Sequence, residues 1–223
     1  MRSSALGSQR LTSGLPATLA SLSLLGIAIY VALDIILGFL PPHYSVIHQP
    51  ESDYGVGPYG YLMGINFIVR GLFTLACVAA LWGRRTLKSR GEWVGAGLLV
   101  LWAICSMLLA AFPTDIEGAV ATTHGKLHGL LALIAFPAAL IGELILSSRL
   151  RNDAGWQRFM RLPWIVAWLA LPAFLWTGAT VARVSAHRGT AGLAERVFLA
   201  LVIAWIGIIA FRLREEHASS AST

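Results

Sequence analysis

Six long apolar runs dominate this chain, and they constrain its fold more than any other feature. A helix needs about 20 consecutive apolar residues to cross the hydrocarbon core of a bilayer. The runs cover residues 16–40, 58–82, 93–112, 127–146, 163–181 and 193–211. Only 13% of the residues are charged, whereas soluble domains carry about 25%. We therefore predict an all-α fold, a polytopic membrane helix bundle with six transmembrane helices.

The basic residues predict which ends of these helices face the cytoplasm. The connections 83–90 and 147–161 hold four Lys or Arg residues each, whereas the connections 41–57 and 113–123 hold none. The connection after the fifth run is an exception, because it contains Arg183 and a second arginine. Cytoplasmic loops are enriched in Lys and Arg. We therefore expect both termini to be cytoplasmic and the first, third and fifth connections to lie outside.

This topology divides the chain into three parts. We expect a cytoplasmic N-terminal tail at residues 1–15, a six-helix transmembrane domain at 16–213 and a cytoplasmic C-terminal tail at 214–223. The net charge is +6. We attribute it to basic residues in the predicted cytoplasmic connections, which set the topology and face an anionic inner leaflet. We therefore expect the lipid bilayer as a partner and no nucleic acid.

Asp34, Arg70 and Glu143 lie inside predicted spans and are charged residues that a membrane helix is expected to avoid. A charge at the centre of a membrane helix costs about 2.5–3.5 kcal/mol on insertion scales, so each needs a partner or a task. Arg70 lies near the midplane, and its long side chain can reach outward toward Asp34. We predict an Asp34–Arg70 pair, which either fixes helix packing or belongs to a binding site. Glu143 lies toward the cytoplasmic end and is a weaker candidate.

Histidines and acids gather on the predicted outer side. His124 and His128 are four residues apart at the start of the fourth span, so they lie on one helical face. Such a pair can hold a divalent metal such as zinc, with a carboxylate and water completing the coordination. Asp115, Asp53 or His48 can supply the third ligand. The alternative is a pair of histidines that hydrogen-bond Asp115 or loop carbonyl groups.

Three motifs, in this order, are similar to those of a known membrane family. They are "YSVIHQPESDYGVGPYGYLMGINFIVRG", then "FPTD" followed by "THGKLHG", and finally "GLAERVFLALVIAWIGIIAFRL". Over residues 26–213 the chain resembles the family called domain of unknown function 998. The positions that match its pattern are Ser52, Asp53, Pro113, Asp115, His128, Arg196 and Trp205. The resemblance implies a six-span bacterial or archaeal membrane protein, distantly similar to DRAM-like proteins in architecture, and it implies no particular reaction.

Three functional hypotheses remain open for a multi-pass protein of a prokaryotic cell membrane. The first is a lipid- or small-solute-binding or transport-assisting module, whose extracytoplasmic pocket holds a lipid headgroup or a small polar ligand. Its candidate ligand-binding residues are Ser52, Asp53, Asp34, Arg70 and Arg196. The second is a metal-assisted hydrolase of a lipid or prenyl-linked substrate. Its candidate catalytic residues are Asp115, His124 and His128, which with His48 are also the candidate metal ligands. The third is a structural partner of another membrane protein.

Overall fold

The computed structural model describes residues 2–84, 86–116, 119–181 and 189–221, which form six α-helices and one short 3₁₀ helix. The elements are α1 (Arg2–Phe39), η1 (Glu51–Gly55), α2 (Gly60–Gly83), α3 (Arg90–Leu109), α4 (Thr123–Leu150), α5 (Arg161–Val181) and α6 (Ala191–Ala221). Each α-helix is long and apolar enough to cross a membrane. The predicted all-α fold with six spans is therefore confirmed. Arg183, considered above for topology, lies outside the described residues.

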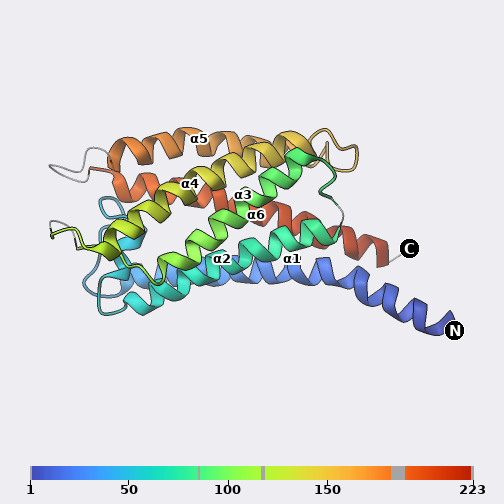
Figure 1. Cartoon of the computed structure of the whole chain (residues 1–223), viewed down its shortest axis with the longest axis horizontal. Coiled ribbons are helices and arrows are strands. Elements are labelled where there is room, and N and C mark those ends of the chain that lie inside the picture. Colours follow the sequence, from blue (N-terminus) through green and yellow to red (C-terminus); the bar gives the residue numbers. More distant parts are fainter. Residues whose placement is uncertain (1, 85, 117–118, 182–188, 222–223) are drawn as a thin grey trace.

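The six helices form one elongated bundle with both chain ends at the same end of it (Figure 1). Each helix packs against the next one along the chain, and α6 packs back onto α1. We call the end that carries the chain ends the termini end. The opposite end, which carries η1 and the α3–α4 connection, is called the distal end. Which end faces the cytoplasm stays a prediction.

The helices pack through the polar and small stripes that helical spacing predicts. On α2, the stripe of Asn66, Arg70, Thr74 and Cys77 is buried. On α4, the stripe from His128 to Glu143 is buried or half-buried, while His124 at its start is exposed. Small and polar residues are typical of helix interfaces in membranes. Large aliphatic side chains point outward instead, as at Leu133, which is 71% exposed.

Glycines allow α2 and α3 to approach each other closely. A Cβ atom on Gly71 of α2 would lie 2.6 Å from the backbone carbonyl oxygen of Ala103 on α3. That oxygen belongs to helical backbone, so it cannot move aside as a flexible side chain would. A Cβ atom added to Gly97 of α3 would have no neighbouring atom within 4 Å. Substitution by alanine raises helix propensity at both glycines but causes a steric clash only at Gly71. Comparing the two substitutions therefore isolates the effect of packing.

We predict that Gly71→Ala lowers the free energy of unfolding by about 1–3 kcal/mol, because the added methyl group overpacks the α2–α3 contact. Gly97→Ala, the matched control, should leave the protein as stable or raise its stability by up to about 1 kcal/mol. Reversible unfolding in mixed micelles with dodecyl sulfate measures both changes. Equal effects of the two substitutions would contradict the close approach.

Candidate functional site

The connection between α1 and α2 folds into the distal end of the bundle. Its short helix η1 buries Glu51, Asp53 and Tyr54, and Glu51 is only 1% exposed. A buried carboxylate requires hydrogen bonds or an opposite charge. This connection therefore belongs to the interior of the molecule.

Glu51 is the ion-pair partner of Arg70. Its Oε2 atom lies 3.4 Å from Nη1 of Arg70, which is also 1% exposed. Its Oε1 atom accepts a 2.6 Å hydrogen bond from the hydroxyl group of Tyr30 on α1. The predicted Asp34–Arg70 pair is therefore wrong, because the long arginine side chain meets the inward-folded loop instead of its neighbour on α1.

The Arg70 guanidinium is held from its other sides by α2 and α3. Its Nε atom donates to the hydroxyl oxygen of Ser106 over 3.2 Å. It also lies 5.0 Å from the ring centre of Phe67 and 4.8 Å from that of Trp102. Such aromatic faces stabilise a desolvated cation. One arginine thus links α2, α3 and η1, and through Glu51 it also links α1.

Arg196 of α6 also binds the α1–α2 connection. Its Nη1 atom donates to the carbonyl oxygens of Val46 and Gln49 over 3.2 and 2.7 Å. Its guanidinium lies 5.2 Å from the ring centre of Tyr54. Asp34 is half-buried nearby, within electrostatic reach of Arg196. These two predicted binding residues lie near the loop, and neither lines the adjoining cavity.

A cavity of about 330 Å³ lies beside this polar network, between α4, α5 and the start of α6. Five polar residues line it, namely Ser52, Arg70, His128, Thr177 and Glu195. Its other walls are apolar or small and come mainly from α4 and α5, including Gly129, Ala132, Leu133, Phe136, Phe174 and Gly178. The structure therefore gathers three of the predicted site residues, Ser52, Arg70 and His128, at one cavity.

Glu195 is the cavity residue that sequence reasoning missed. It is 8% exposed and has no hydrogen bond or ion pair within the described part of the chain. It lies within electrostatic reach of Glu51 and Arg70. The predicted sixth span begins at Leu193 and therefore already contained this acid. Its neighbour Arg196 was predicted instead, because that position matches the family pattern.

The predicted metal ligands do not converge. His128 places Nδ1 2.7 Å from the carbonyl oxygen of Phe112, and the ring of His124 packs 5.6 Å from that of Phe112. His48 lies 2.5 Å from the carbonyl oxygen of Gly189. Within the described ranges, no three His, Cys, Asp or Glu residues are grouped as metal ligands would be. For His128 and His48 the contacts are those of the alternative, hydrogen bonds to loop carbonyl groups.

Asp115 supports the start of α4. Its carboxylate accepts hydrogen bonds from the backbone N–H and the hydroxyl group of Thr122, over 2.9 and 2.6 Å. The Thr122 hydroxyl oxygen in turn accepts from the backbone N–H of Gly125 and caps the helix. The two bonds from Thr122 lower the pKa of Asp115 below its usual value of 3.8. Asp115 thus stabilises the α3–α4 connection. That connection also contains Phe112, whose carbonyl oxygen contacts His128.

Glu143 lies apart from the cavity, farther along α4 toward the termini end. It is fully buried, and neither carboxylate oxygen has a hydrogen-bond partner in the described part of the chain. It lies within electrostatic reach of Cys77 on α2. This glutamate provides an internal comparison for Glu195, because both are buried acids without a hydrogen-bond partner but only Glu195 faces a cavity.

We predict that Glu51→Gln lowers the free energy of unfolding by about 3–5 kcal/mol, because it leaves Arg70 buried without an opposite charge. Asp34→Asn should change it by less than about 1 kcal/mol, since Asp34 has no ion pair to lose. Unfolding in mixed micelles compares the two variants. A larger loss for Asp34→Asn would restore the Asp34–Arg70 pair.

We also predict a pH dependence that originates at Asp115. Because the pKa of this carboxyl is lower in the folded protein, ionised Asp115 stabilises the fold above its usual value of 3.8. That stabilisation is lost as the pH falls through the folded-state pKa. The thermal midpoint of Asp115→Asn should therefore fall less steeply between pH 5 and pH 2 (about the range in which carboxylates titrate) than that of the wild type. Parallel curves would contradict this role.

Comparison with known proteins places this site in a family. No curated protein and no solved structure matches the chain. The family described as "Protein of unknown function (DUF998)" matches residues 24–212, which contain η1, the Glu51–Arg70 pair and the cavity. The match covers the first two motifs quoted above and all but the last residue of the third. The chain is a multi-pass membrane protein and belongs to the DUF998 family.

Proposed function

We propose that the protein binds a lipid-like molecule in the cavity between α4 and α5, and either holds it or assists its movement. Its polar group, a hydroxyl or an ammonium, lies against Glu195, Ser52 and His128, and its apolar body lies along α4 and α5. The observation that carries this proposal is Glu195, a buried acid without a hydrogen-bond partner that lines a largely apolar cavity.

The position of the cavity supports a ligand that arrives through the bilayer. Gly129 and Leu133 of α4 and Gly178 of α5 line the cavity and are themselves exposed on the bundle surface. In a membrane this surface faces lipid tails. Gly129 and Gly178 have no side chains that would narrow the opening between α4 and α5. A molecule with an apolar body can therefore enter sideways, without crossing the aqueous loops.

The charges around the cavity favour a polar group that donates hydrogen bonds. Three carboxyl groups, those of Asp34, Glu51 and Glu195, lie within electrostatic reach of two guanidinium groups, those of Arg70 and Arg196. Arg70 is already paired with Glu51, and Arg196 already binds loop carbonyl oxygens. A ligand carboxylate or phosphate would therefore meet excess negative charge, whereas a hydroxyl or ammonium group would satisfy Glu195.

We infer that the cavity lies in the outer half of the membrane. The connection with Lys88 and Arg90 and the α4–α5 connection with Arg151 and Arg158 are both at the termini end. The positive-inside rule assigns that end to the cytoplasm. The distal end, with η1 and the cavity, then faces outward across a prokaryotic cell membrane. The metal-hydrolase hypothesis gains no comparable support, because its ligands do not converge among the described residues.

Three C16 probes that differ only in their polar end test the proposal. Hexadecylamine, hexadecanol and palmitate are added to the protein in nanodiscs, and the thermal midpoint is measured. We predict that the amine and the alcohol raise the midpoint, because a ligand that binds only the folded state stabilises it. Palmitate should not raise it. A midpoint raised only by palmitate would overturn the proposed charge preference.

Matched variants assign the effect to the cavity. Glu195→Gln should weaken amine binding by about tenfold, the loss expected for a charge-assisted hydrogen bond. Glu143→Gln makes the same chemical change at a buried acid away from the cavity and should not affect it. Ala132→Phe should block the cavity, whereas Leu130→Phe, at an exposed position of α4 that does not line it, should not. Equal effects within either pair would contradict this site.

A further inference from the structure

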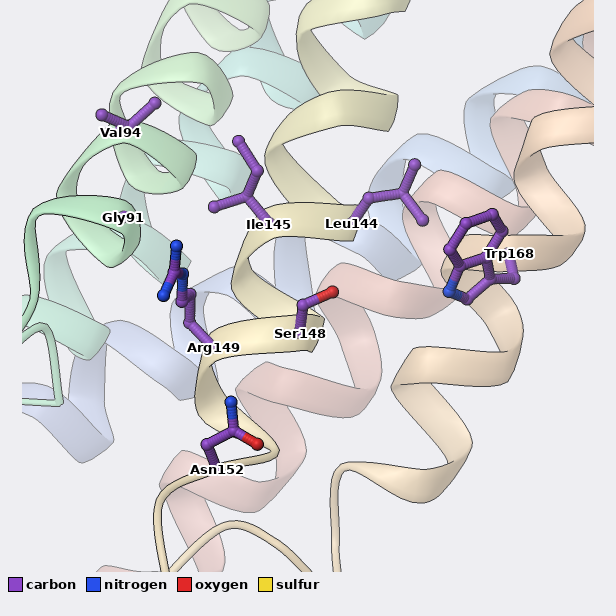
Figure 2. A pocket seen from close by; sticks show the side chains of 8 residues that line it. All are labelled: Gly91, Val94, Leu144, Ile145, Ser148, Arg149, Asn152 and Trp168. Carbon is purple, nitrogen blue, oxygen red and sulfur yellow. The ribbon is translucent and has the colours of Figure 1, made fainter.

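A second, larger groove lies at the termini end, between α3, α4 and the first half of α5 (Figure 2). Its volume is about 570 Å³. Three polar side chains, Ser148, Arg149 and Asn152, lie at one end of it. The rest of the lining consists of Gly91, Val94, Leu144, Ile145 and Trp168. The groove is therefore divided along its length into a polar part and an apolar part.

Arg149 has no counter-ion in this groove. Two acids lie near lining residues in the sequence, Asp153 next to Asn152 and Glu92 next to Gly91, and both already have other partners. Asp153 pairs with Lys88, and Glu92 accepts hydrogen bonds from the backbone N–H groups that precede α3. No carboxylate of the described residues lies within ion-pair distance of Arg149. The groove thus offers a cation that remains available for an anionic group.

The Arg149 side chain packs closely against α3 at Gly91. A Cβ atom on Gly91 would lie 2.7 Å from Nε of Arg149, so the missing side chain at Gly91 makes room for the guanidinium in this position. Figure 2 shows the Arg149 side chain directed toward Gly91, the Ser148 hydroxyl directed toward the side of Trp168, and Asn152 on the next turn. A guanidinium with nearby hydroxyl and amide groups suits the oxygens of a phosphate.

The apolar part of the groove lies farther from the termini end than Arg149 does. Leu144 precedes Arg149 by five residues on α4, which is about 7.5 Å along a helix axis. Trp168 lies beside it on α5, with its ring 6.0 Å from that of Trp164. Tryptophan rings are enriched at the level of lipid headgroups. A soluble anion would contact Arg149 and leave this apolar wall unused.

We propose that this groove is a binding site for an anionic phospholipid of the leaflet at the termini end. The phosphate binds Arg149, with Ser148 and Asn152 beside it, and one acyl chain lies along Val94, Leu144, Ile145 and Trp168. This site is separate from the cavity at the distal end, and its expected ligand has the opposite charge preference. It therefore stands whether or not the proposed function of that cavity holds.

Native mass spectrometry of the full chain in detergent tests the site, with equimolar dioleoyl phosphatidylglycerol and dioleoyl phosphatidylcholine as probes. We expect the wild type to bind phosphatidylglycerol more tightly. Arg149→Gln should weaken that binding by about tenfold, the loss of one charge-assisted contact. Arg90→Gln is the matched control, because it removes the same charge next to the groove without changing its lining. Its effect should stay within about twofold, because Arg90 does not line the groove and makes no direct contact with a phosphate bound there.

Two further arms distinguish a lipid site from simple attraction of anions. Val94→Trp keeps every charge but fills the apolar part, and it should weaken binding of phosphatidylglycerol. Soluble glycerol phosphate in large excess should not displace the lipid. The proposal is overturned if the wild type binds both lipids equally, or if Arg149→Gln and Arg90→Gln act alike. It is also overturned if Val94→Trp has no effect or glycerol phosphate competes fully.

Discussion

The buried ion pair between Glu51 and Arg70 is the interaction on which the distal half of the bundle depends. Arg70 lies inside a membrane span, where an unpaired charge is costly. Its carboxylate partner comes from the α1–α2 connection, so that connection has to fold into the bundle. Tyr30, Ser106 and the rings of Phe67 and Trp102 complete the surroundings of the pair. Four elements are thereby held in one arrangement. Breaking such a pair costs far more than replacing both of its members, because a single remaining charge stays buried.

This arrangement also determines what the cavity beside it can bind. Because Arg70 is neutralised by Glu51, the cavity does not present a free cation, although an arginine lines it. Glu195 is left as the polar group that a ligand can satisfy. At the termini end the acid is paired and the cation is not. Asp153 forms an ion pair with Lys88, whereas Arg149 lines the groove without a counter-ion among the described residues. The two proposals therefore assign opposite charge preferences to the two ends of the bundle.

The sequence predicted the parts of this structure that follow from periodicity and length. Six apolar runs predicted six helices, and the buried stripe of α2 followed from the spacing of Asn66, Arg70, Thr74 and Cys77. The partner of Arg70 could not be predicted in this way, because Glu51 lies in a loop and a loop has no periodic pattern to show that it folds inward. Proximity in the spans suggested Asp34 instead. The spacing of His124 and His128 was compatible with a metal site, but only the tertiary structure shows that His128 contacts a loop carbonyl group and that Asp115 supports a helix start.

The central claim is that Glu51, rather than Asp34, compensates Arg70 inside the membrane. A double-mutant cycle on the free energy of unfolding tests it most directly, with Glu51→Gln, Arg70→Gln and the combined variant. The account predicts that the combined variant is more stable than the sum of the single losses implies, with a coupling of about 1–3 kcal/mol. The same cycle with Asp34→Asn should give a coupling below about 0.5 kcal/mol. Coupling to Asp34 with none to Glu51 would contradict the account.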